Sequence, residues 1–270
     1  MIRPKILVVT IATGKYLGYF ERNLPGWRRA FGAAGEVTFQ VLTDSIREGG
    51  HNLGPDVEVM FQKQLEWPMI TLLRYEILLS QVNFSSFDFV VWLDADMEAV
   101  GNVPASIFEH RSIVLARHPG YELPIIRPSR KSWPSRILSV IAILIRANTG
   151  YFALGDWECR ESSTAFVPRK SRKSYVHGAV WLGPSMELRE MCSLLAERTS
   201  EDLRNGIIAI WHDESHLNWY AANFKPVLAD LGFSDWEEST NFGTRPTIFL
   251  SQDKAVLDAA FNDGDGEDLS

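Results

Sequence analysis

The chain has 270 residues, and 46% of them are hydrophobic, so it can bury a substantial core as one large domain or as two closely joined lobes. Its formal net charge of -7 argues against a nucleic-acid-binding protein, because such a surface normally carries a basic stripe. Cys159 and Cys192 match no metal-binding spacing, and a chain of this size needs no disulfide, so a reduced cytosolic protein is the simpler interpretation.

The first hundred residues alternate between predicted strands and helices. Apolar runs predict buried strands at residues 6–11, 37–42, 57–61 and 89–93. Apolar residues at helical spacing predict helices at residues 19–31, where Pro25 disturbs the middle, and at residues 70–82. This alternation is typical of a doubly wound nucleotide-binding half in an α/β fold. Gly14, in the loop after the first strand, permits a tight turn where a ligand can approach the backbone.

The strand at residues 89–93 stops on two aspartates spaced one residue apart, Asp94 and Asp96. Side chains alternate along an extended segment, so we expect both carboxylates to point the same way. Ligands of open α/β sheets bind beyond the carboxyl ends of the strands, and two hard oxygen donors there suit Mg²⁺ or Mn²⁺ carrying a phosphate. Aspartates at strand ends are also common as turn formers and helix caps, so the metal interpretation needs support from the rest of the chain.

The second half of the chain contains further predicted elements and one stretch of different composition. We expect strands at residues 113–116 and 175–183, and helices at residues 186–199 and 207–220. Between them, residues 127–136 are basic and rich in turn formers, and residues 137–145 are strongly apolar. This apolar run is too short to span a bilayer, and a core or lid helix is favoured there over contact with an anionic membrane surface.

The segment from Trp211 to Asn218 is the second polar cluster. His212 and His216 are four residues apart, so on a helix they would share a face and could bind zinc. The motif H-E-x-x-H is absent, however, because the glutamate falls two residues after the first histidine. Helix caps and hydrogen bonds between helices are a structural alternative. An acidic pair beside a tryptophan also suits a carbohydrate site, since glycosyl chemistry needs a carboxylate at the anomeric carbon.

The octapeptide at residues 211–218, W-H-D-E-S-H-L-N, resembles the signature of glycosyltransferase family 6, which includes the histo-blood-group A and B transferases and the α-1,3-galactosyltransferase. The resemblance extends over residues 10–235, with the other matching blocks in the family's order. It implies a retaining enzyme of the GT-A fold that moves galactose or N-acetylgalactosamine from a UDP-sugar to the 3-hydroxyl of a galactoside acceptor. That fold is α/β, with a Rossmann-like nucleotide-binding half joined to an acceptor-binding half.

The resemblance also implies a domain organisation. We expect one catalytic domain at residues 1–255, with the UDP-binding half at about 1–110 and the acceptor-binding half at 111–255. The stretch near residues 123–149 looks like an insertion between matched blocks. Two interpretations fit this insertion: an acceptor lid, and a peripheral membrane contact through residues 127–146. Residues 256–270 would form an acidic tail.

Donor binding is assigned to particular residues by the same resemblance. The loop residues would hold uridine, Arg74 would contact the donor, Asp213 would hold the hydroxyls of the donor sugar, and Asp94 and Asp96 would bind Mn²⁺, or Mg²⁺, on the diphosphate. The loop residues are Ile11, Ala12, Thr13 and Tyr16. Many bacterial relatives have asparagines in place of the two aspartates and need no metal, so the aspartates retained here favour metal dependence.

Glu214 matches the carboxylate that lies beneath the anomeric carbon, acting either as a nucleophile or as an electrostatic stabiliser of an oxocarbenium-like state. On the acceptor side, Trp211 would pack on the sugar and His118 would hydrogen-bond it, with Asp235 as a further acceptor-binding candidate. Two alternatives stay open: another retaining GT-A transferase with a different sugar or linkage, and a catalytically impaired glycan-binding protein.

His177, Gly178 and Ala179 occupy the family's donor-selecting position. The sequence is intermediate between the histidine and two alanines of the α-1,3-galactosyltransferase and the two glycines of the A transferase, and the extra methyl group favours galactose. In the family, basic side chains of the carboxyl-terminal segment lie over UDP. In the matching segment of this chain, Lys254 is the basic residue present. The vertebrate anchor and stem are missing from this sequence, which fits the soluble bacterial or viral relatives. From the cysteines and from the lack of a signal-peptide pattern we expect a cytoplasmic protein, with peripheral contact to the inner membrane as the alternative.

Overall fold

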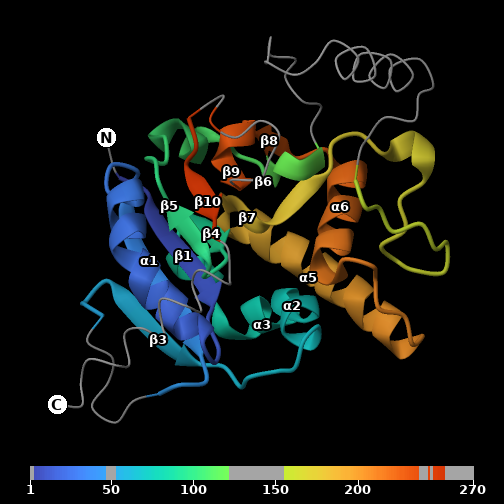
Figure 1. Cartoon of the computed structure of the whole chain (residues 1–270), viewed down its shortest axis with the longest axis horizontal. Helices are drawn as coiled ribbons and strands as arrows, with labels where there is room; N and C mark the ends of the chain where they lie inside the picture. The colour runs from blue at the N-terminus through green and yellow to red at the C-terminus, as the bar shows by residue number, and fades with distance from the viewer. Residues whose placement is uncertain (1–2, 47–52, 122–154, 237–242, 244–245, 253–270) are drawn as a thin grey trace, which may run out of the picture.

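The computed structural model describes residues 3–46, 53–121, 155–236, 243 and 246–252 (Figure 1). Its strands and α-helices are β1 (Lys5–Ile11), α1 (Tyr16–Phe31), β2 (Glu36–Thr43), β3 (Val57–Phe61), α2 (Met69–Leu72), α3 (Arg74–Gln81), β4 (Phe89–Leu93), β5 (Met97–Ala99), β6 (Val114–Arg117), β7 (Val176–Pro184), α5 (Ser185–Arg204), α6 (His212–Phe224), β8 (Val227–Ala229), β9 (Ser234–Trp236) and β10 (Phe249–Ser251). The predicted insertion, Lys254 and the acidic tail lie outside the described residues.

Within these residues the main sheet has seven strands in the order β3-β2-β1-β4-β7-β6-β8. The first four strands run parallel, and β7 pairs antiparallel with both β4 and β6. The order reverses between β1 and β4, which is the topological switch point where open α/β sheets bind ligands. A smaller sheet, β5-β10-β9, brings the chain after Asp96 against the last described strand.

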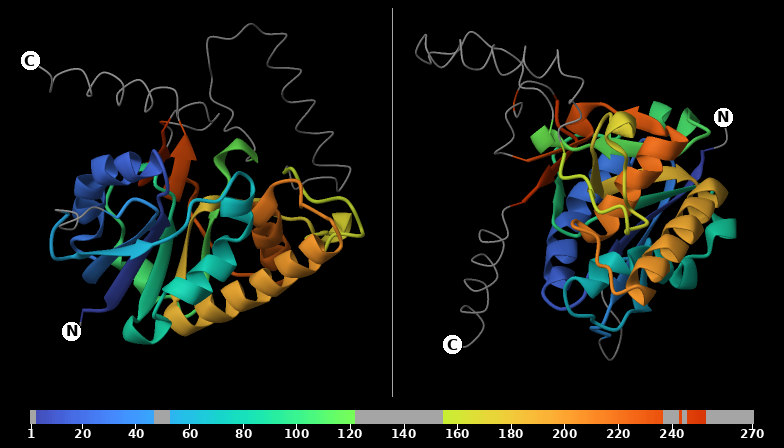
Figure 2. Two further views of the ribbon diagram at one scale, coloured as in Figure 1. Left: turned by 90° about the horizontal axis from the view of Figure 1, so that it is seen from below. Right: turned by 90° about the vertical axis from the view of Figure 1, so that its right-hand side faces the viewer.

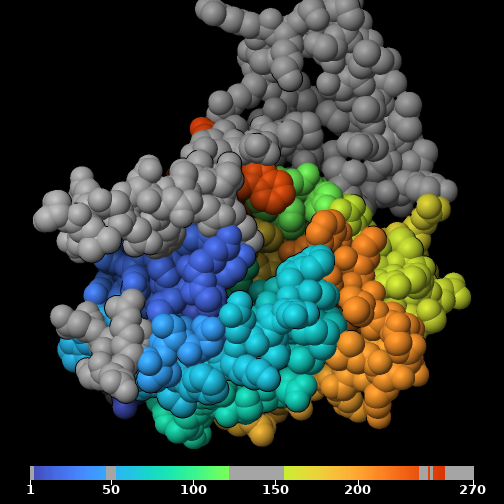
Figure 3. All heavy atoms as spheres, turned by 60° about the horizontal axis from the view of Figure 1, so that its bottom comes forward, coloured from blue at the N-terminus to red at the C-terminus, as the bar shows by residue number. Residues whose placement is uncertain are grey.

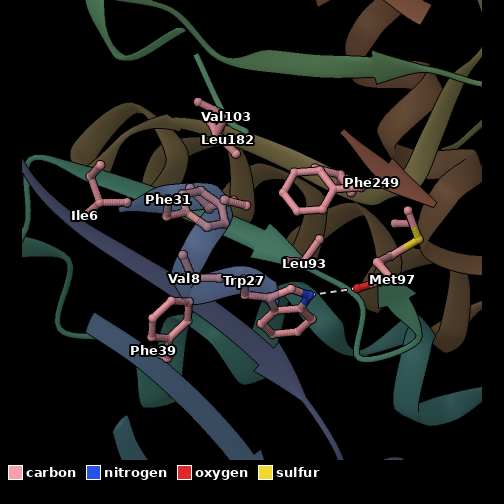
Figure 4. Packing of buried hydrophobic residues seen from close by; sticks show 14 of the residues in the cluster. Ile6, Val8, Trp27, Phe31, Phe39, Leu93, Met97, Val103, Leu182 and Phe249 are labelled. Carbon is pink, nitrogen blue, oxygen red and sulfur yellow. Dashed lines mark hydrogen bonds between the residues drawn. The ribbon is translucent and has the colours of Figure 1, made fainter. Parts of the chain in front are cut away.

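Apolar side chains fill both faces of the main sheet. On one face, Trp27 and Phe31 of α1 pack with Phe39, Met97 and Phe249 (Figure 4). On the other face α3, α5 and α6 supply a second cluster. Figure 2 shows α1 and α5 on opposite sides of the sheet. Strand β4 contributes to both clusters, with Val91 and Leu93 in the first and Val90 and Trp92 in the second, so the prediction of a strand buried on both faces is confirmed.

Most predicted elements are present, with shifted ends. The strands at 57–61 and 89–93 occupy the predicted residues, whereas α1 begins three residues earlier than expected, at Tyr16. The helix predicted at 70–82 is divided into α2 and α3 at Leu73. The helix predicted at 207–220 begins only at His212, since the preceding residues form no helix.

The extended geometry predicted for Asp94 and Asp96 is wrong. The two aspartates lie in a turn that the Met97 amide closes by donating to the Asp94 carbonyl at 3.1 Å. Both side chains nevertheless line the same hollow. The turn, and not the alternation of side chains along a strand, brings them to the same side.

The backbone carbonyls of this turn are held from two distant parts of the chain. Asn23 Nδ2 of α1 donates to the Ala95 carbonyl at 2.9 Å, and Trp27 Nε1 donates to the Met97 carbonyl at 2.7 Å (Figure 4). The Gln252 amide, directly after β10, donates to the Asp96 carbonyl at 3.1 Å. The position of the two carboxylates therefore depends on α1 and on the last described strand.

We expect Asn23→Ala to lower the free energy of unfolding by about 1–3 kcal/mol, because Asn23 is buried and its loss leaves the Ala95 carbonyl unsatisfied. Urea unfolding measures the change. Asn223→Ala is the matched control, since Asn223 also donates from a helix to a carbonyl, that of Trp219 at 2.8 Å, but is exposed. The control should change the free energy by less than about 0.5 kcal/mol. Equal losses in the two variants would contradict the role given to Asn23.

Candidate functional site

Two adjoining hollows form a cleft at the carboxyl ends of β1 and β4. The first, of about 310 Å³, is lined by six predicted donor residues and by residues 64–67. The second, of about 180 Å³, is lined by His177, Gly178, Ala179, Trp211, Asp213 and Glu214. Thr71, Arg74 and Asp94 line both hollows, so the two are continuous. Figure 3 shows the face where the blue amino-terminal segment, the cyan segment before β4 and the orange α6 region come together. The six donor residues in the first hollow are Ile11, Thr13, Tyr16, Arg74, Asp94 and Asp96.

Arg74 lies at the junction of the two hollows and is almost fully buried. Its guanidinium contacts Asp213 Oδ2 at 2.8 Å and Asp94 Oδ1 at 3.2 Å, and it donates to the Gly178 carbonyl at 2.9 Å. The same group lies 4.3 Å from the ring centre of Trp92, a cation–π distance. Burial alone would lower the pKa of Arg74, but Asp213 and Asp94 raise it by more, so the side chain stays cationic.

More negative charge converges here than Arg74 neutralises. Burial in the cleft raises the pKa of Asp94; Arg74 opposes this rise, while the neighbouring charges of Asp96 and Asp213 add to it. Burial likewise raises the pKa of Asp213 against Arg74. Carboxylate oxygens are hard donors that suit Mn²⁺ or Mg²⁺, and a divalent cation would relieve the repulsion between them. The Asp94–Asp96 turn therefore fits the divalent cation that the sequence predicts.

The first turn of α6 carries the two acidic residues of the octapeptide. His212 adopts φ of 48°, a left-handed conformation that is uncommon for a residue with a side chain, so the chain turns sharply into the helix. Ser215 Oγ accepts from the Trp211 amide at 2.9 Å, and Tyr75 donates from its hydroxyl to the Asp213 carbonyl at 2.9 Å. Asp213 and Glu214 thus lie at a helix amino terminus, where the helix dipole stabilises negative charge.

Glu214 reaches across to β7. Its Oε2 accepts from the Gly178 amide at 2.7 Å, and a β-carbon added at Gly178 would lie 3.2 Å from that oxygen. Burial raises the pKa of Glu214 to about 8, against the lowering effect of the Gly178 hydrogen bond. Asn218 fixes this pairing of helix and strand, because its side chain bonds both the amide and the carbonyl of Val176.

Two histidines flank Glu214. The His118 and His177 rings are 4.7 Å apart, and His177 Nδ1 lies 2.7 Å from Ser234 Oγ. Burial lowers the pKa of His118 to about 4 and that of His177 well below its ordinary value, so both imidazoles are neutral near pH 7. Trp236 closes this side, with its ring centre 5.0 Å from that of His118.

Trp211 stands at the rim of the cleft and is about half exposed. Its Nε1 donates to Asp156 Oδ2 at 3.1 Å, and the Tyr121 hydroxyl donates to the same oxygen at 2.6 Å. One carboxylate oxygen therefore joins two aromatic side chains that lie on either side of the rim.

The segment before α6 is anchored by Glu158. Its Oε2 accepts from the Ile210 amide at 3.0 Å and from Arg160 at 2.6 Å, and Arg160 donates in turn to the Ile208 carbonyl at 2.6 Å. These bonds hold the residues immediately before Trp211, which form neither helix nor strand.

Three predicted site residues do not line the cleft. Ala12 is fully buried, and His118 lies beside the lining residues His177 and Glu214 without lining either hollow itself. Asp235 is also fully buried in β9, where the following amide, that of Trp236, donates to its Oδ1 at 2.9 Å.

The histidines of the zinc alternative have different surroundings. His212 packs against Trp67, with ring centres 4.8 Å apart, whereas His216 is fully buried and lies 3.7 Å from Asp202 Oδ2. Neither belongs to a group of three convergent metal ligands within the described residues. The zinc-hydrolase alternative therefore gains no support from this part of the chain.

Several residues of the site were not singled out from the sequence. Trp67 lines the first hollow and is 72% exposed, which is unusual for a tryptophan. No motif or periodicity marks Asp156, Tyr121 or Trp236 in the sequence. The fold brings them next to the site. No signal singles out Trp67 either, because the residues around it include Leu65, Met69 and Ile70.

Comparison with known proteins agrees with this geometry. The family model described as Glycosyltransferase family 6 matches residues 138–238. The O-antigen biosynthesis glycosyltransferase WbnI of Escherichia coli is 25% identical over 234 residues, which cover 86% of this chain and 88% of that protein. The histo-blood group ABO system transferase 2 of Rattus norvegicus and the globoside alpha-1,3-N-acetylgalactosaminyltransferase 1 of Gallus gallus are each 25% identical, over 82% and 81% of this chain. The matched regions cover 60% and 58% of those two animal proteins.

The parallel-rich α/β sheet, the cleft at its switch point and these matches are consistent with a GT-A-like glycosyltransferase fold. The chain is similar to glycosyltransferase family 6 over residues 138–238 and to the three glycosyltransferases above over most of its length. Enzymes of this class use a nucleotide-sugar donor and a glycan acceptor. Of the helices described, none combines the length and the hydropathy that crossing a membrane requires.

We expect Glu158→Gln to lower the free energy of unfolding at pH 7 by about 2 kcal/mol, because it weakens hydrogen bonds made to a charged group. Burial raises the pKa of Glu158, but the Arg160 hydrogen bonds lower it by more, to about 2. Since this value lies below the ordinary 4.5, the stabilisation is present above pH 4.5 and is lost as the pH falls toward 2.

Urea unfolding at several pH values from 7 to 3 measures this effect. The difference between the native protein and Glu158→Gln should shrink as the pH falls. Glu161→Gln, a change at an exposed neighbour, is the matched control and should alter stability by less than about 0.5 kcal/mol at every pH. A difference for Glu158→Gln that stays constant with pH would contradict the ion-pair explanation.

Proposed function

We propose that this chain is a retaining transferase that moves galactose, or N-acetylgalactosamine, from a UDP-sugar to the 3-hydroxyl of a galactoside acceptor and forms an α-1,3 linkage. The observation that carries the proposal is the continuity of the cleft, which leads from the predicted uridine loop through Arg74 and Asp94 to Glu214. A nucleotide in the first hollow would place its sugar in the second. The name of the similar protein from Gallus gallus states an alpha-1,3 linkage and N-acetylgalactosamine, which supports this linkage and the second of the two donors.

The donor would lie along the cleft with uridine against Ile11, Thr13 and Tyr16. Arg74 is close enough to the second hollow to neutralise negative charge on the diphosphate as UDP leaves. Asp94 and Asp96 would hold Mn²⁺, or Mg²⁺, at the diphosphate, and such an ion supplies electrostatic stabilisation of the leaving group. Lys254, outside the described residues, is proposed to add a further positive charge over the donor.

Glu214 would lie beneath the anomeric carbon and stabilise the positive charge that develops there. The burial that raises its pKa also leaves its ionised form poorly solvated, so an adjacent positive charge is a favourable partner. The Gly178 amide holds Oε2, which fixes the orientation of the carboxylate.

The acceptor would enter from the side of Trp211 and the two histidines. Trp211 offers an exposed ring face for packing against a galactose, and the buried neutral His118 can exchange hydrogen bonds with its hydroxyls. Asp213, paired with Arg74, would hold hydroxyls of the donor sugar. Asp235, which is buried in β9 beside Trp236, is the further residue proposed for the acceptor side.

The proposal is tested by measuring UDP release from UDP-galactose, UDP-N-acetylgalactosamine and UDP-glucose over a panel of β-galactosides, with and without Mn²⁺. We expect release with one of the first two donors, dependence on both metal and acceptor, and an α-1,3 product by NMR. A different linkage would indicate another retaining transferase. Glycan binding without UDP affinity, seen by calorimetry, would indicate a binding protein and refute the proposal.

For Glu214→Gln we expect turnover to fall at least about 100-fold, because the neutral amide cannot balance charge at the anomeric carbon. UDP affinity, measured by calorimetry, should change little. Glu187→Gln is the matched control, since Glu187 also lies in the first turn of a helix, α5, but is exposed. Normal turnover in the Glu214 variant would remove this residue from the mechanism.

Donor choice should respond to Ala179→Gly. Removing the methyl group enlarges the second hollow, so we expect the ratio of kcat/KM for UDP-N-acetylgalactosamine to that for UDP-galactose to rise by about 10-fold or more. Because both donors are assayed on one preparation, the ratio is independent of the folded fraction. Gly178→Ala serves as comparison, since its β-carbon would crowd Glu214 Oε2 and should lower turnover with both donors. An unchanged ratio for Ala179→Gly would exclude this position as the selector.

A further inference from the structure

His118, His177 and Glu214 form a convergent group of potential metal ligands. One ligand atom from each residue lies within 4.8 Å of the others. The three residues come from separate elements: His118 directly follows β6, His177 lies in β7 and Glu214 lies in α6. The group is distinct from Asp94 and Asp96, which are the residues proposed to hold the donor's cation.

The donor atoms of this group select a different kind of cation. Two imidazoles and one carboxylate are the ligand set of many zinc sites that keep a fourth position open. Imidazole suits Zn²⁺, Cu²⁺ and Ni²⁺, whereas the all-oxygen pair Asp94 and Asp96 suits Mg²⁺ and Mn²⁺. Ligand atoms around tetrahedral Zn²⁺ are about 3.4 Å apart, given Zn–N bonds of about 2.1 Å. Small side-chain rotations can close the difference from 4.8 Å.

Both imidazoles are prepared for a metal by their surroundings. Burial keeps them neutral, which is the form that binds metal. Ser234 Oγ, 2.7 Å from His177 Nδ1, orients that ring and leaves Nε2 as the other ligand atom, the arrangement seen around metal-binding histidines.

His118 carries a small opposing cost. The Gly120 amide donates to His118 Nδ1 at 3.2 Å, so the ring proton resides on Nε2. Metal binding at Nε2 moves this proton to Nδ1 and breaks that long hydrogen bond. Loss of one neutral hydrogen bond is a small effect compared with the strength of a structural zinc site, so it lowers the affinity without preventing binding.

Charges around the group act in both directions. Arg74 disfavours a cation at His177, but Arg74 is already paired with Asp94 and Asp213. Glu214 gives up its proton when it binds metal, and the resulting carboxylate has no cationic side chain bonded to it in the described contacts. Tyr175 and Tyr121, which pack beside His118, are neutral near pH 7.

We propose that His118, His177 and Glu214 form a second divalent-cation site, selective for Zn²⁺ and similar cations, whose occupation blocks sugar transfer by engaging Glu214. Zinc binding stands on the ligand geometry alone, whereas the block rests on the proposed function. Zinc in this place would be an inhibitor that does not compete with Mn²⁺, because the two ions have separate ligands.

The site is tested by titrating Zn²⁺ alone into chelator-treated protein that carries Asp94→Asn and Asp96→Asn, which removes the oxygen site. Calorimetry should give one Zn²⁺ per chain, and Co²⁺ in its place should give the strong visible absorption of a four-coordinate ion. His177→Asn should weaken zinc binding at least about 10-fold and abolish the cobalt band. His110→Asn and His212→Asn, made at histidines outside the group, should leave both signals unchanged.

Two further measurements make the outcomes decisive. Thermal unfolding and UDP binding establish that His177→Asn is folded, and His118→Gln provides a second variant with the same expectation. In the transfer assay, inhibition by Zn²⁺ should persist when Mn²⁺ is raised. Absence of zinc binding, or binding unaffected by both histidine changes, overturns the site. Inhibition reversed by Mn²⁺ places the inhibitory zinc at the aspartates and overturns the proposed block. If the protein transfers no sugar in the absence of zinc, the proposed function is contradicted, whereas the zinc site is still decided by the binding measurements.

Discussion

The buried ion pairs of Arg74 are the interaction on which the site depends. One guanidinium contacts carboxylates that follow β4 and begin α6 and also a carbonyl of β7, so three elements far apart in sequence share a single positive charge. Breaking a buried pair by removing one partner is far more costly than losing a surface pair, because a charge is then left unsolvated. The same charge is placed where a leaving diphosphate would need it, so the group that holds the site together is also suited to act in it.

The fold and the site were predictable from sequence to different extents. The strand at 89–93 and the octapeptide at 211–218 were correctly placed, because an uninterrupted apolar run and a specific motif are local signals. The turn at Asp94 and Asp96 was not, since its shape is set by Asn23 and the Gln252 amide, which are remote in sequence. Hydrogen bonds of this kind leave no periodicity to detect.

The rim of the cleft illustrates the same limit. Asp156 joins Trp211 and Tyr121 through one oxygen, and Glu158 fixes the chain just before Trp211, yet neither acid stands in a recognisable pattern. A segment without regular structure is thus ordered by carboxylates that accept several hydrogen bonds each. These carboxylates hold single loop segments, whereas Arg74 joins three elements at once.

The left-handed conformation of His212 has a consequence for how the site could change. A side chain in this conformation costs about 1–2 kcal/mol relative to glycine, so the chain entering α6 is less stable than it could be. Glycine would relieve this strain but would remove the ring that packs on Trp67. Trp67, which lines the first hollow, would then lose this contact with α6. A change at His212 would therefore increase the stability of the chain entering α6 at the expense of the packing of Trp67 beside the cleft. His212 is for this reason a position where an engineered substitution could trade cleft shape for stability.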